Sequence, residues 1–192
     1  DNSLGKRIAF DICPVNMILN HLASEKNFVF DKDGEIARAG LINSDLLNQL
    51  NKLDFYKNPS PKSLGFEWFT ENFLPVFENA NIPVENKLRT ACEHIAHQIS
   101  AIVNAQPNVG PAKRNSKLLV TGGGAFNKFL IEVLSAKCKT EIILPSDEII
   151  NFKEAIIFAF LGLLRMQNKM NTLASVTGAK MDSSGGAIYN AF

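Results

Sequence analysis

Three consecutive glycines, Gly122–Gly124, are the residues whose type and spacing point most directly to ligand binding in this chain. Glycine has no Cβ, so the backbone of this turn can lie against a flat or anionic ligand. The apolar spacing from Phe126 to Leu134 predicts a helix whose first turn presents unpaired N–H groups and a partial positive charge. The alternative is a tight strand-to-helix connection that binds nothing, because such connections often need glycine in any case.

A carboxylate is the second candidate group. Arg7–Cys13 (RIAFDIC) predicts a short strand with Asp11 near its C-terminal end, and a helix is predicted to follow from Val15. A carboxylate at the end of a buried strand costs free energy unless a ligand or partner uses it. The alternative role of Asp11 is the N-cap of the following helix, and this segment by itself favours neither interpretation.

The elements that must position these residues alternate between strands and helices. Besides Arg7–Cys13, short β-branched or apolar runs predict strands at Leu118–Thr121 and Thr140–Leu144. Periodic apolar residues predict helices over Val15–Ala23, Glu35–Ala39, Asn43–Tyr56, Glu67–Phe77, Pro83–Gln106, the segment after the glycines and Asn151–Met166. This order indicates an α/β fold with helices packed on a sheet. Since ligands bind at the carboxyl ends of strands in open sheets, we expect Asp11 and Gly122–Gly124 to face one cleft.

The spacing of other residues excludes or disfavours several kinds of site. TGGGA lacks the G-x-G-x-x-G spacing of dinucleotide-binding turns, and there is no Walker-type lysine loop. The segment that starts at Asp31 resembles a calcium loop superficially, but Ile36 and Ile42 stand where that loop needs a glycine and an acid. His94 and His97 are three residues apart on the longest predicted helix, yet no third ligand is implied, which favours a structural role over metal binding.

Composition limits the class of protein. The chain has 192 residues, of which 46% are hydrophobic and 20% charged, and its net charge is +1, as in ordinary soluble globular domains. This balance gives no electrostatic case for nucleic acid or an anionic membrane as a partner. The three cysteines form neither a metal-ligand pattern nor a disulfide framework, which favours a reducing, cytoplasmic location. The longest uncharged apolar run, Ala155–Leu164, is too short to span a bilayer and predicts a helix buried on most sides.

Six short motifs, taken in their order along the chain, resemble a known family. They are FD-x-x-P-x-N-M, FDKDGEIARAG, PSPKSLG-x-E-x-F, TGGGAFN, NFKEAIIFAFLG and L-x-SVTGA. Each motif is weak by itself, but the series runs from about Arg7 to Lys180 and resembles the C-terminal half of anhydro-N-acetylmuramic acid kinase.

This resemblance implies a fold and an activity. The family belongs to the sugar kinase, heat-shock 70 and actin superfamily, in which two ribonuclease-H-like lobes, each a mixed sheet with packed helices, close over ATP. Residues 1–180 would be the C-terminal nucleotide-binding lobe, and residues 181–192 a partly ordered tail. The implied reaction is phosphorylation of 1,6-anhydro-N-acetylmuramic acid while water opens the anhydro ring. Its product, N-acetylmuramic acid 6-phosphate, arises during cytoplasmic peptidoglycan recycling.

The resemblance also implies roles for individual residues. Gly122, Gly123 and Gly124 correspond to the adenosine motif, and Asn127 at the start of the next helix would help to close that pocket. Asp11 and Asn16 bound the second phosphate loop, where Asp11 would lie near the β/γ-phosphates and hold Mg²⁺, through water in one arrangement. Glu154 resembles an acidic residue of the family's KEA segment near the nucleotide cleft.

Two departures from the family pattern qualify these roles. The family commonly has D-T-G-P-G-N at the second phosphate loop, whereas residues 11–16 read DICPVN, so fewer backbone amides are free to approach phosphate. The glycine- and serine-rich first phosphate loop and the aspartate that activates water have no counterpart in this sequence. We therefore expect a fragment without a catalytic residue of its own, whose partner is a missing N-terminal lobe.

Three expectations follow for the isolated chain. It should bind adenine nucleotide weakly without turning over sugar, because phosphoryl transfer needs groups on all sides of the phosphates. Loss of a lobe should expose apolar surface and promote self-association, for example as a homodimer. The alternatives to the anhydro-sugar kinase are a non-enzymatic nucleotide-binding module and another sugar kinase of the same superfamily.

Overall fold

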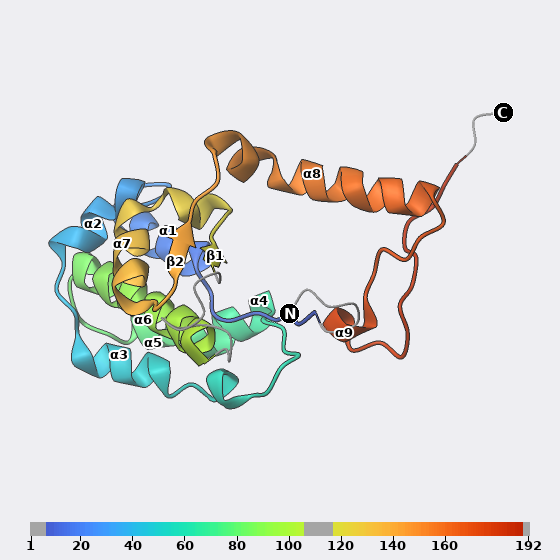
Figure 1. The fold of residues 1–192 in the computed structure, drawn as a ribbon. Helices are drawn as coiled ribbons and strands as arrows, with labels where there is room; N and C mark the ends of the chain where they lie inside the picture. Colours follow the sequence, from blue (N-terminus) through green and yellow to red (C-terminus); the bar gives the residue numbers. More distant parts are fainter. Residues whose placement is uncertain (1–6, 106–116, 190–192) are drawn as a thin grey trace. The chain divides into compact units, whose positions relative to one another are not determined.

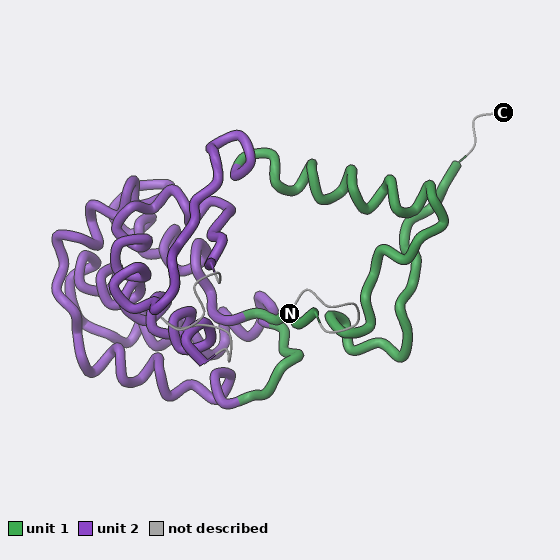
Figure 2. Tube along the Cα trace, viewed as in Figure 1, with its two compact units in different colours: residues 1–11, 58–63, 151–192 green, residues 12–57, 64–150 purple. Residues whose placement is uncertain are grey.

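The computed structural model describes residues 7–105 and 117–189, and the chain divides into two compact units (Figure 2). Unit 1 consists of Asp1–Asp11, Asn58–Ser63 and Asn151–Phe192. Unit 2 consists of Ile12–Lys57 and Leu64–Ile150. Both units therefore combine segments that are far apart in the sequence.

Unit 2 is built around α6 (Val84–Ala105), a helix of 22 residues (Figure 1). Four shorter helices pack against it, namely α1 (Asn16–Ser24), α2 (Glu35–Ala39), α3 (Ser44–Asn51) and α7 (Lys128–Lys137). Apolar residues recur along α6 every three or four positions, so it presents apolar side chains to several neighbours. Fully buried side chains in this core are Ile18, Leu22, Leu46, Leu50, Leu88, Ile95 and Leu134.

The ends of these helices follow from local sequence signals. The Asn43 side chain accepts a hydrogen bond from Leu46 N at 2.9 Å, which makes it the N-cap of α3. The observed α3 is shorter than the helix predicted over Asn43–Tyr56, because it ends at Asn51 and a separate 3₁₀ turn, Asp54–Lys57, follows. The predicted α2 is confirmed at both ends, and α1 and α6 begin one residue later than expected.

An aromatic helical segment follows the proline-rich loop of residues 58–65. It consists of α4 (Phe66–Trp68), a π-helical turn (Phe69–Phe73) and α5 (Leu74–Glu78), which together confirm the predicted helix. Pro75 explains the π turn, since it has no N–H to donate to the preceding turn and the hydrogen-bond pattern must shift around it.

The aromatic side chains of this segment enter the core of unit 2. Phe69, Phe73 and Phe77 are buried. Trp68 is half-buried, and its ring centroid lies 4.9 Å from that of Phe55 and 5.9 Å from that of Phe73. The segment is therefore held by aromatic packing rather than by regular hydrogen bonding alone.

The sheet of unit 2 is a parallel pair, β1 (Lys117–Leu119) and β2 (Glu141–Ile143). Leu118 lies opposite Ile142 in the register. The glycine turn and α7 connect the strands, so this part is a βαβ unit, and the α/β prediction is confirmed at that level. The ribonuclease-H-like identity of the lobe stays a prediction.

The predicted strand at Arg7–Cys13 is wrong. Residues 7–13 have no regular secondary structure, and Ile8 is 67% exposed. Asp11 N donates to Lys62 O at 3.0 Å, so this backbone bonds to the proline-rich loop instead of a β-ladder. The sheet of the described residues therefore keeps only the two later strands of the predicted three.

Two helices lie in the last part of the chain, α8 (Asp147–Met166) and α9 (Ala174–Thr177). The prediction that α8 begins at Asn151 after a loop is wrong. Ser146 O accepts from Ile150 N at 3.0 Å, and the Ser146 side chain, by its hydrogen bond, lowers the pKa of Glu148. Ser146 is thus the N-cap, with acids in the first turn where the helix dipole favours them.

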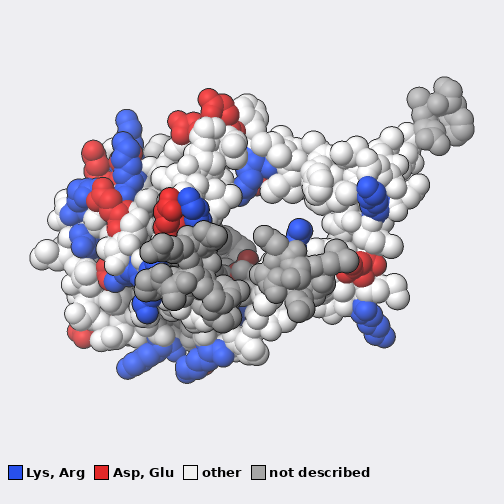
Figure 3. Space-filling view, viewed as in Figure 1, with Lys and Arg blue, Asp and Glu red and all other residues white. Residues whose placement is uncertain are grey.

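The expectation that the middle of α8 is buried on most sides is also wrong. Phe158 is 70% exposed and Phe160 is 57% exposed. The surface drawn over this helix is largely uncharged in the space-filling view (Figure 3). Each helix among the described residues is too short or too polar to span a lipid bilayer.

Candidate functional site

The glycine turn links β1 to α7 in unit 2. Gly122 has φ +88° and ψ 176°, a conformation that is almost restricted to glycine. Gly122 O accepts from Ala125 N at 2.9 Å, and Gly124 O accepts from Asn127 N at 3.2 Å, which closes a 3₁₀ turn over Gly123–Phe126. The turn geometry therefore accounts for the first glycine without any ligand.

The second and third glycines lie close to the N-terminus of α1. A Cβ on Gly123 would lie 2.9 Å from Asn16 Nδ2, and one on Gly124 would lie 3.4 Å from Asn16 Oδ1. A Cβ on Gly123 would displace the Asn16 amide, whereas one on Gly124 would make an ordinary van der Waals contact with it. Gly123 thus allows the turn to approach α1 closely.

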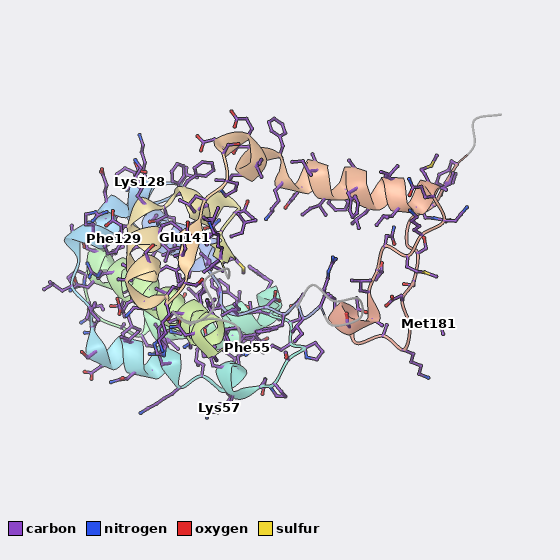
Figure 4. The ribbon with its side chains drawn as sticks, viewed as in Figure 1. Phe55, Lys57, Lys128, Phe129, Glu141 and Met181 are labelled. Carbon is purple, nitrogen blue, oxygen red and sulfur yellow. The ribbon has the colours of Figure 1, made fainter. Side chains whose placement is uncertain are left out.

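Asn127 holds the start of α7. Its Oδ1 accepts from Leu130 N at 2.9 Å, which makes it the N-cap, and the residue is 8% exposed. A Cβ on Gly34 would lie 2.5 Å from Phe129 Cβ and closer still to Asn127 Oδ1. Gly34, which has φ +73°, therefore lets the turn before α2 pack against the first turn of α7. Figure 4 labels Phe129 and its neighbour Lys128 on α7.

Charged groups hold the turn before α2 in place. Both oxygens of the Asp31 carboxylate accept backbone hydrogen bonds, from Ile36 N at 2.9 Å and from Ala37 N at 3.0 Å. Lys128 Nζ lies 3.1 Å from Asp33 Oδ1. The turn is thus tied to α2 by hydrogen bonds and to α7 by an ion pair.

A cavity of about 330 Å³ in unit 2 is lined by residues of α1, of the turn before α2 and of the glycine turn before α7. Its lining residues are Asn16, Leu19, Asn20, Phe30, Asp31, Asp33, Gly123, Phe126 and Asn127. Phe30 is 57% exposed and Phe126 is 40% exposed, so each offers ring surface to a ligand. Apolar ring surface combined with a few amides and carboxylates suits a flat heteroaromatic ligand that also carries hydroxyl groups.

One buried hydroxyl at the glycine turn lacks a partner. Thr121 Oγ1 is buried and makes no hydrogen bond to any residue that the structure describes. A buried hydroxyl without a partner costs free energy, so such groups are normally satisfied by water or a ligand. Thr121 directly precedes Gly122 in the chain, so the hydroxyl lies at the start of the glycine turn.

Asp11 lies in unit 1, in an irregular segment. Its carboxylate Oδ2 accepts a hydrogen bond from Ser63 Oγ at 3.2 Å. The alternative interpretation as an N-cap is wrong, because the N-cap residue of α1 is Val15 and no side chain caps that helix. Glu154, also in unit 1, is exposed and lies well inside α8, so it is not the first-turn acid that the predicted helix start implied.

His94 is a structural residue. Its Nδ1 lies 2.7 Å from Asn51 Oδ1 and its Nε2 lies 2.8 Å from the Tyr56 hydroxyl. Since an amide oxygen can only accept, Nδ1 carries the proton and Nε2 accepts from Tyr56. Burial, with a smaller contribution from His97, lowers the pKa of His94 to about 3. Within residues 7–105 and 117–189, no group of three or more His, Cys, Asp or Glu side chains is placed to hold a metal ion.

Comparison with known proteins supplies the family. The family described as anhydro-N-acetylmuramic acid kinase matches the chain over residues 4–191. The chain belongs to the anhydro-N-acetylmuramic acid kinase family.

Curated relatives with the same name are moderately similar to this chain. The kinase of Aliivibrio fischeri is 34% identical over 194 residues, which cover 96% of this chain and 50% of the relative. That of Vibrio cholerae is 33% identical, with 96% and 50% covered, and that of Francisella tularensis subsp. novicida is 34% identical, with 90% and 46% covered. The chain thus spans about half the length of the curated anhydro-N-acetylmuramic acid kinases that it matches.

The structure brings together only some of the residues that the sequence predicted for a nucleotide site. Asn16, Gly123 and Asn127 line one cavity, while Gly122 and Gly124 flank it in the same turn. The joint position of these residues with Asp11 and Glu154, which belong to unit 1, stays a prediction.

Six lining residues were not predicted as site residues. They are Leu19, Asn20, Phe30, Asp31, Asp33 and Phe126. The FDKDG sequence indicates only a family motif and an incomplete calcium loop, and the packing of this turn against α7 is a tertiary contact. Gly34 was the available signal, since glycine in a short turn permits close approach of another element.

Proposed function

We propose that this chain is the C-terminal, nucleotide-binding lobe of an ATP-dependent kinase that phosphorylates 1,6-anhydro-N-acetylmuramic acid. The reaction would open the anhydro ring with water and give N-acetylmuramic acid 6-phosphate in cytoplasmic peptidoglycan recycling. Membership of the kinase family supports the reaction class. The observation that carries the proposal is the convergence of Asn16, Gly123 and Asn127 on one cavity of unit 2.

The cavity has features that fit the nucleoside part of ATP. Its volume of about 330 Å³ is within the range of roughly 300–1,000 Å³ that small-molecule sites occupy. Gly123 leaves backbone open to the ligand, and a Cβ there would displace the Asn16 amide. The rings of Phe30 and Phe126 can contact a purine, and the Asp33 carboxylate can accept ribose hydroxyl hydrogen bonds.

The phosphates and Mg²⁺ would be held by residues outside this cavity. In this proposal Asp11 coordinates Mg²⁺, directly or through water, and Glu154 lies near the nucleotide cleft. Residues 1–180 form the lobe and residues 181–192 its tail, while the group that activates water comes from an N-terminal lobe. Phosphoryl transfer depends mainly on positioning and charge stabilisation around the phosphates, so this chain alone supplies only part of the machinery.

Adenosine binding tests the nucleoside cavity. Gly123→Val should weaken adenosine binding by this chain roughly tenfold or more, because the branched side chain overpacks the contact with Asn16. Isothermal titration with adenosine and ADP measures the effect. Gly162→Val is the matched control, since a Cβ at Gly162 on α8 meets nothing within 4 Å.

A second variant separates loss of binding from loss of folding. Asn20 is exposed on α1 and lines the cavity, so Asn20→Ala should leave the circular dichroism spectrum unchanged while it weakens adenosine binding. Wild-type chain that binds neither adenosine nor ADP, or a Gly123→Val chain that binds both as tightly as wild type, would contradict the nucleoside assignment.

Turnover tests the assignment of the chain as one lobe. The isolated chain should form no N-acetylmuramic acid 6-phosphate from ATP and the anhydro sugar, whereas the full-length protein that carries it should form this product. Product analysis by mass spectrometry distinguishes the two cases. Turnover by the isolated chain would overturn the lobe assignment, and a full-length protein that binds ATP without turnover would favour a non-enzymatic nucleotide-binding module.

A further inference from the structure

Unit 1 contains an open groove, lined by both polar and apolar residues, that the nucleoside assignment does not use. Its volume is about 610 Å³, and it is lined by Ala9, Phe10, Asp11, Pro61, Lys62, Ser63, Val176 and Thr177. These residues come from three separate segments, which include the PSPKSLG and SVTGA motifs. The groove therefore gives both motifs a common place in unit 1.

Backbone and side-chain contacts hold the segments together. Asp11 N donates to Lys62 O at 3.0 Å, and Ser63 Oγ donates to Asp11 Oδ2 at 3.2 Å. Gly178, with φ +75°, ends α9, and a Cβ on it would lie 3.8 Å from Pro61 Cγ. The proline-rich loop is thus in contact with both of the other groove segments, and its main chain is bonded to one of them.

The polar groups of the groove are of two kinds. Asp11 contributes a carboxylate, while Ser63 and Thr177 contribute hydroxyls that can donate or accept. Of the eight lining residues, which the structure describes in full, Lys62 alone carries a positive charge, and it is half-buried. A lysine ammonium group suits an oxyanion, hydroxyls can donate to the same group, and a carboxylate suits the hydroxyls or the metal ion of the same ligand.

We propose that Lys62 binds an oxyanionic group of a substrate in this groove and so determines specificity for charged ligands. The inference rests on the proposed function for the identity of the ligands. Two oxyanions meet the description: the carboxylate of the lactyl ether that distinguishes muramic acid from glucosamine, and a phosphate of the nucleotide. Both would form a charge-assisted hydrogen bond with the ammonium group.

Equilibrium binding to the full-length protein tests the proposal without requiring turnover. Two ligand pairs isolate the oxyanion: 1,6-anhydro-N-acetylmuramic acid against 1,6-anhydro-N-acetylglucosamine, and ADP against adenosine. In each pair, the Kd of the neutral ligand divided by the Kd of the charged ligand measures the preference for the charged ligand. Lys62→Met should reduce this ratio roughly 10- to 100-fold for one of the pairs, which is the worth of a hydrogen bond to a charged group.

The controls separate charge from structure. The bond from Asp11 N goes to the Lys62 main chain, so Lys62→Met keeps it, and Lys62→Arg should restore most of the lost preference because it keeps the charge. Lys169→Met removes an exposed lysine of the same unit that does not line the groove, and it should change neither ratio.

Each outcome decides the proposal. A lost preference confined to the sugar pair identifies the carboxylate, and one confined to the nucleotide pair identifies a phosphate. Ratios that Lys62→Met leaves within twofold of wild type, or a loss of affinity that is equal for charged and neutral ligands and is not rescued by Lys62→Arg, would overturn it. Absence of turnover in wild type, together with an intact effect of Lys62 on one ratio, would reject the kinase reaction while the groove assignment stands.

Discussion

At the scale of single residues, the start of α7 in unit 2 is held by close contacts of Gly34 and Phe129. Gly34 fits against Asn127 because it has no side chain, and its positive φ already favours glycine. Phe129 is buried, and the guanidinium carbons of Arg38 and Arg89 lie 4.9 Å and 4.7 Å from its ring centroid. These contacts hold the first turn of α7 in place, and cation–π attraction contributes to them.

Buried His94 predicts a pH dependence of stability. The folded group binds a proton only near its pKa of about 3, whereas the unfolded histidine does so below about pH 6.5. The unfolded state therefore binds more protons between these values, and the free energy of unfolding falls as pH decreases, by up to about 1.4 kcal/mol per pH unit. Between about pH 7.5 and about pH 5 we expect a loss of roughly 2 kcal/mol from this group.

Urea unfolding followed by circular dichroism measures this loss. His94→Gln is less stable at neutral pH, because Tyr56 and Asn51 lose their histidine partner, but its stability should vary less with pH than that of wild type. Other titrating groups are common to both proteins and cancel in the comparison. Parallel pH profiles for the two proteins would show that His94 does not titrate as its surroundings imply.

At the scale of elements, Asn127 has a capping role and a proposed binding role, and comparison with the cap of another helix can separate the two. Asn127 caps α7 and lines the cavity, whereas Asn43 caps α3 by the same geometry and does not line it. Each change to alanine should lower the free energy of unfolding by about 1 kcal/mol, the usual worth of such a cap. Only Asn127→Ala should also weaken adenosine binding, and titration calorimetry on both variants checks the difference. Equal adenosine affinities would assign Asn127 to capping alone.

The elements that the sequence predicted correctly are those with strong local signals. Periodic apolar residues predicted both ends of α1 and of α6 to within one residue. The missed start of α8 was also local, since Ser146, Asp147 and Glu148 form a cap followed by first-turn acids. The prediction placed these three residues in a loop before the helix.

The other failures concern contacts between distant segments. Arg7–Cys13 has the composition of a strand, but a strand needs a neighbour, and its backbone bonds to the loop at Lys62 instead. Likewise, the glycine triplet predicted the location of the cavity, but not the wall formed by the turn that contains Gly34. That wall forms because Gly34 packs against Asn127, about 90 residues further along the chain. Apolar periodicity within one element carries no information about such a contact.

At the scale of the whole molecule, exposed apolar surface predicts self-association of the isolated chain. Phe158 and Phe160 on α8 are more than half exposed, and much of the surface over this helix is uncharged in Figure 3. Burial of such side chains between copies is favourable. Sedimentation velocity should show dimers or larger species at high concentration, and Phe158→Ser with Phe160→Ser should shift the distribution toward monomer. A single monomer peak for wild type at every concentration would contradict this prediction.

The chain contains a single tryptophan, and Trp68 packs against Phe55 and Phe73 in unit 2. Its intrinsic fluorescence is therefore a label for that unit alone, present without any modification. The far-ultraviolet signal, in contrast, also includes α8, most of which belongs to unit 1. Denaturation curves from the two signals should coincide only if both units unfold together, so a displaced tryptophan transition would reveal that each unit melts independently.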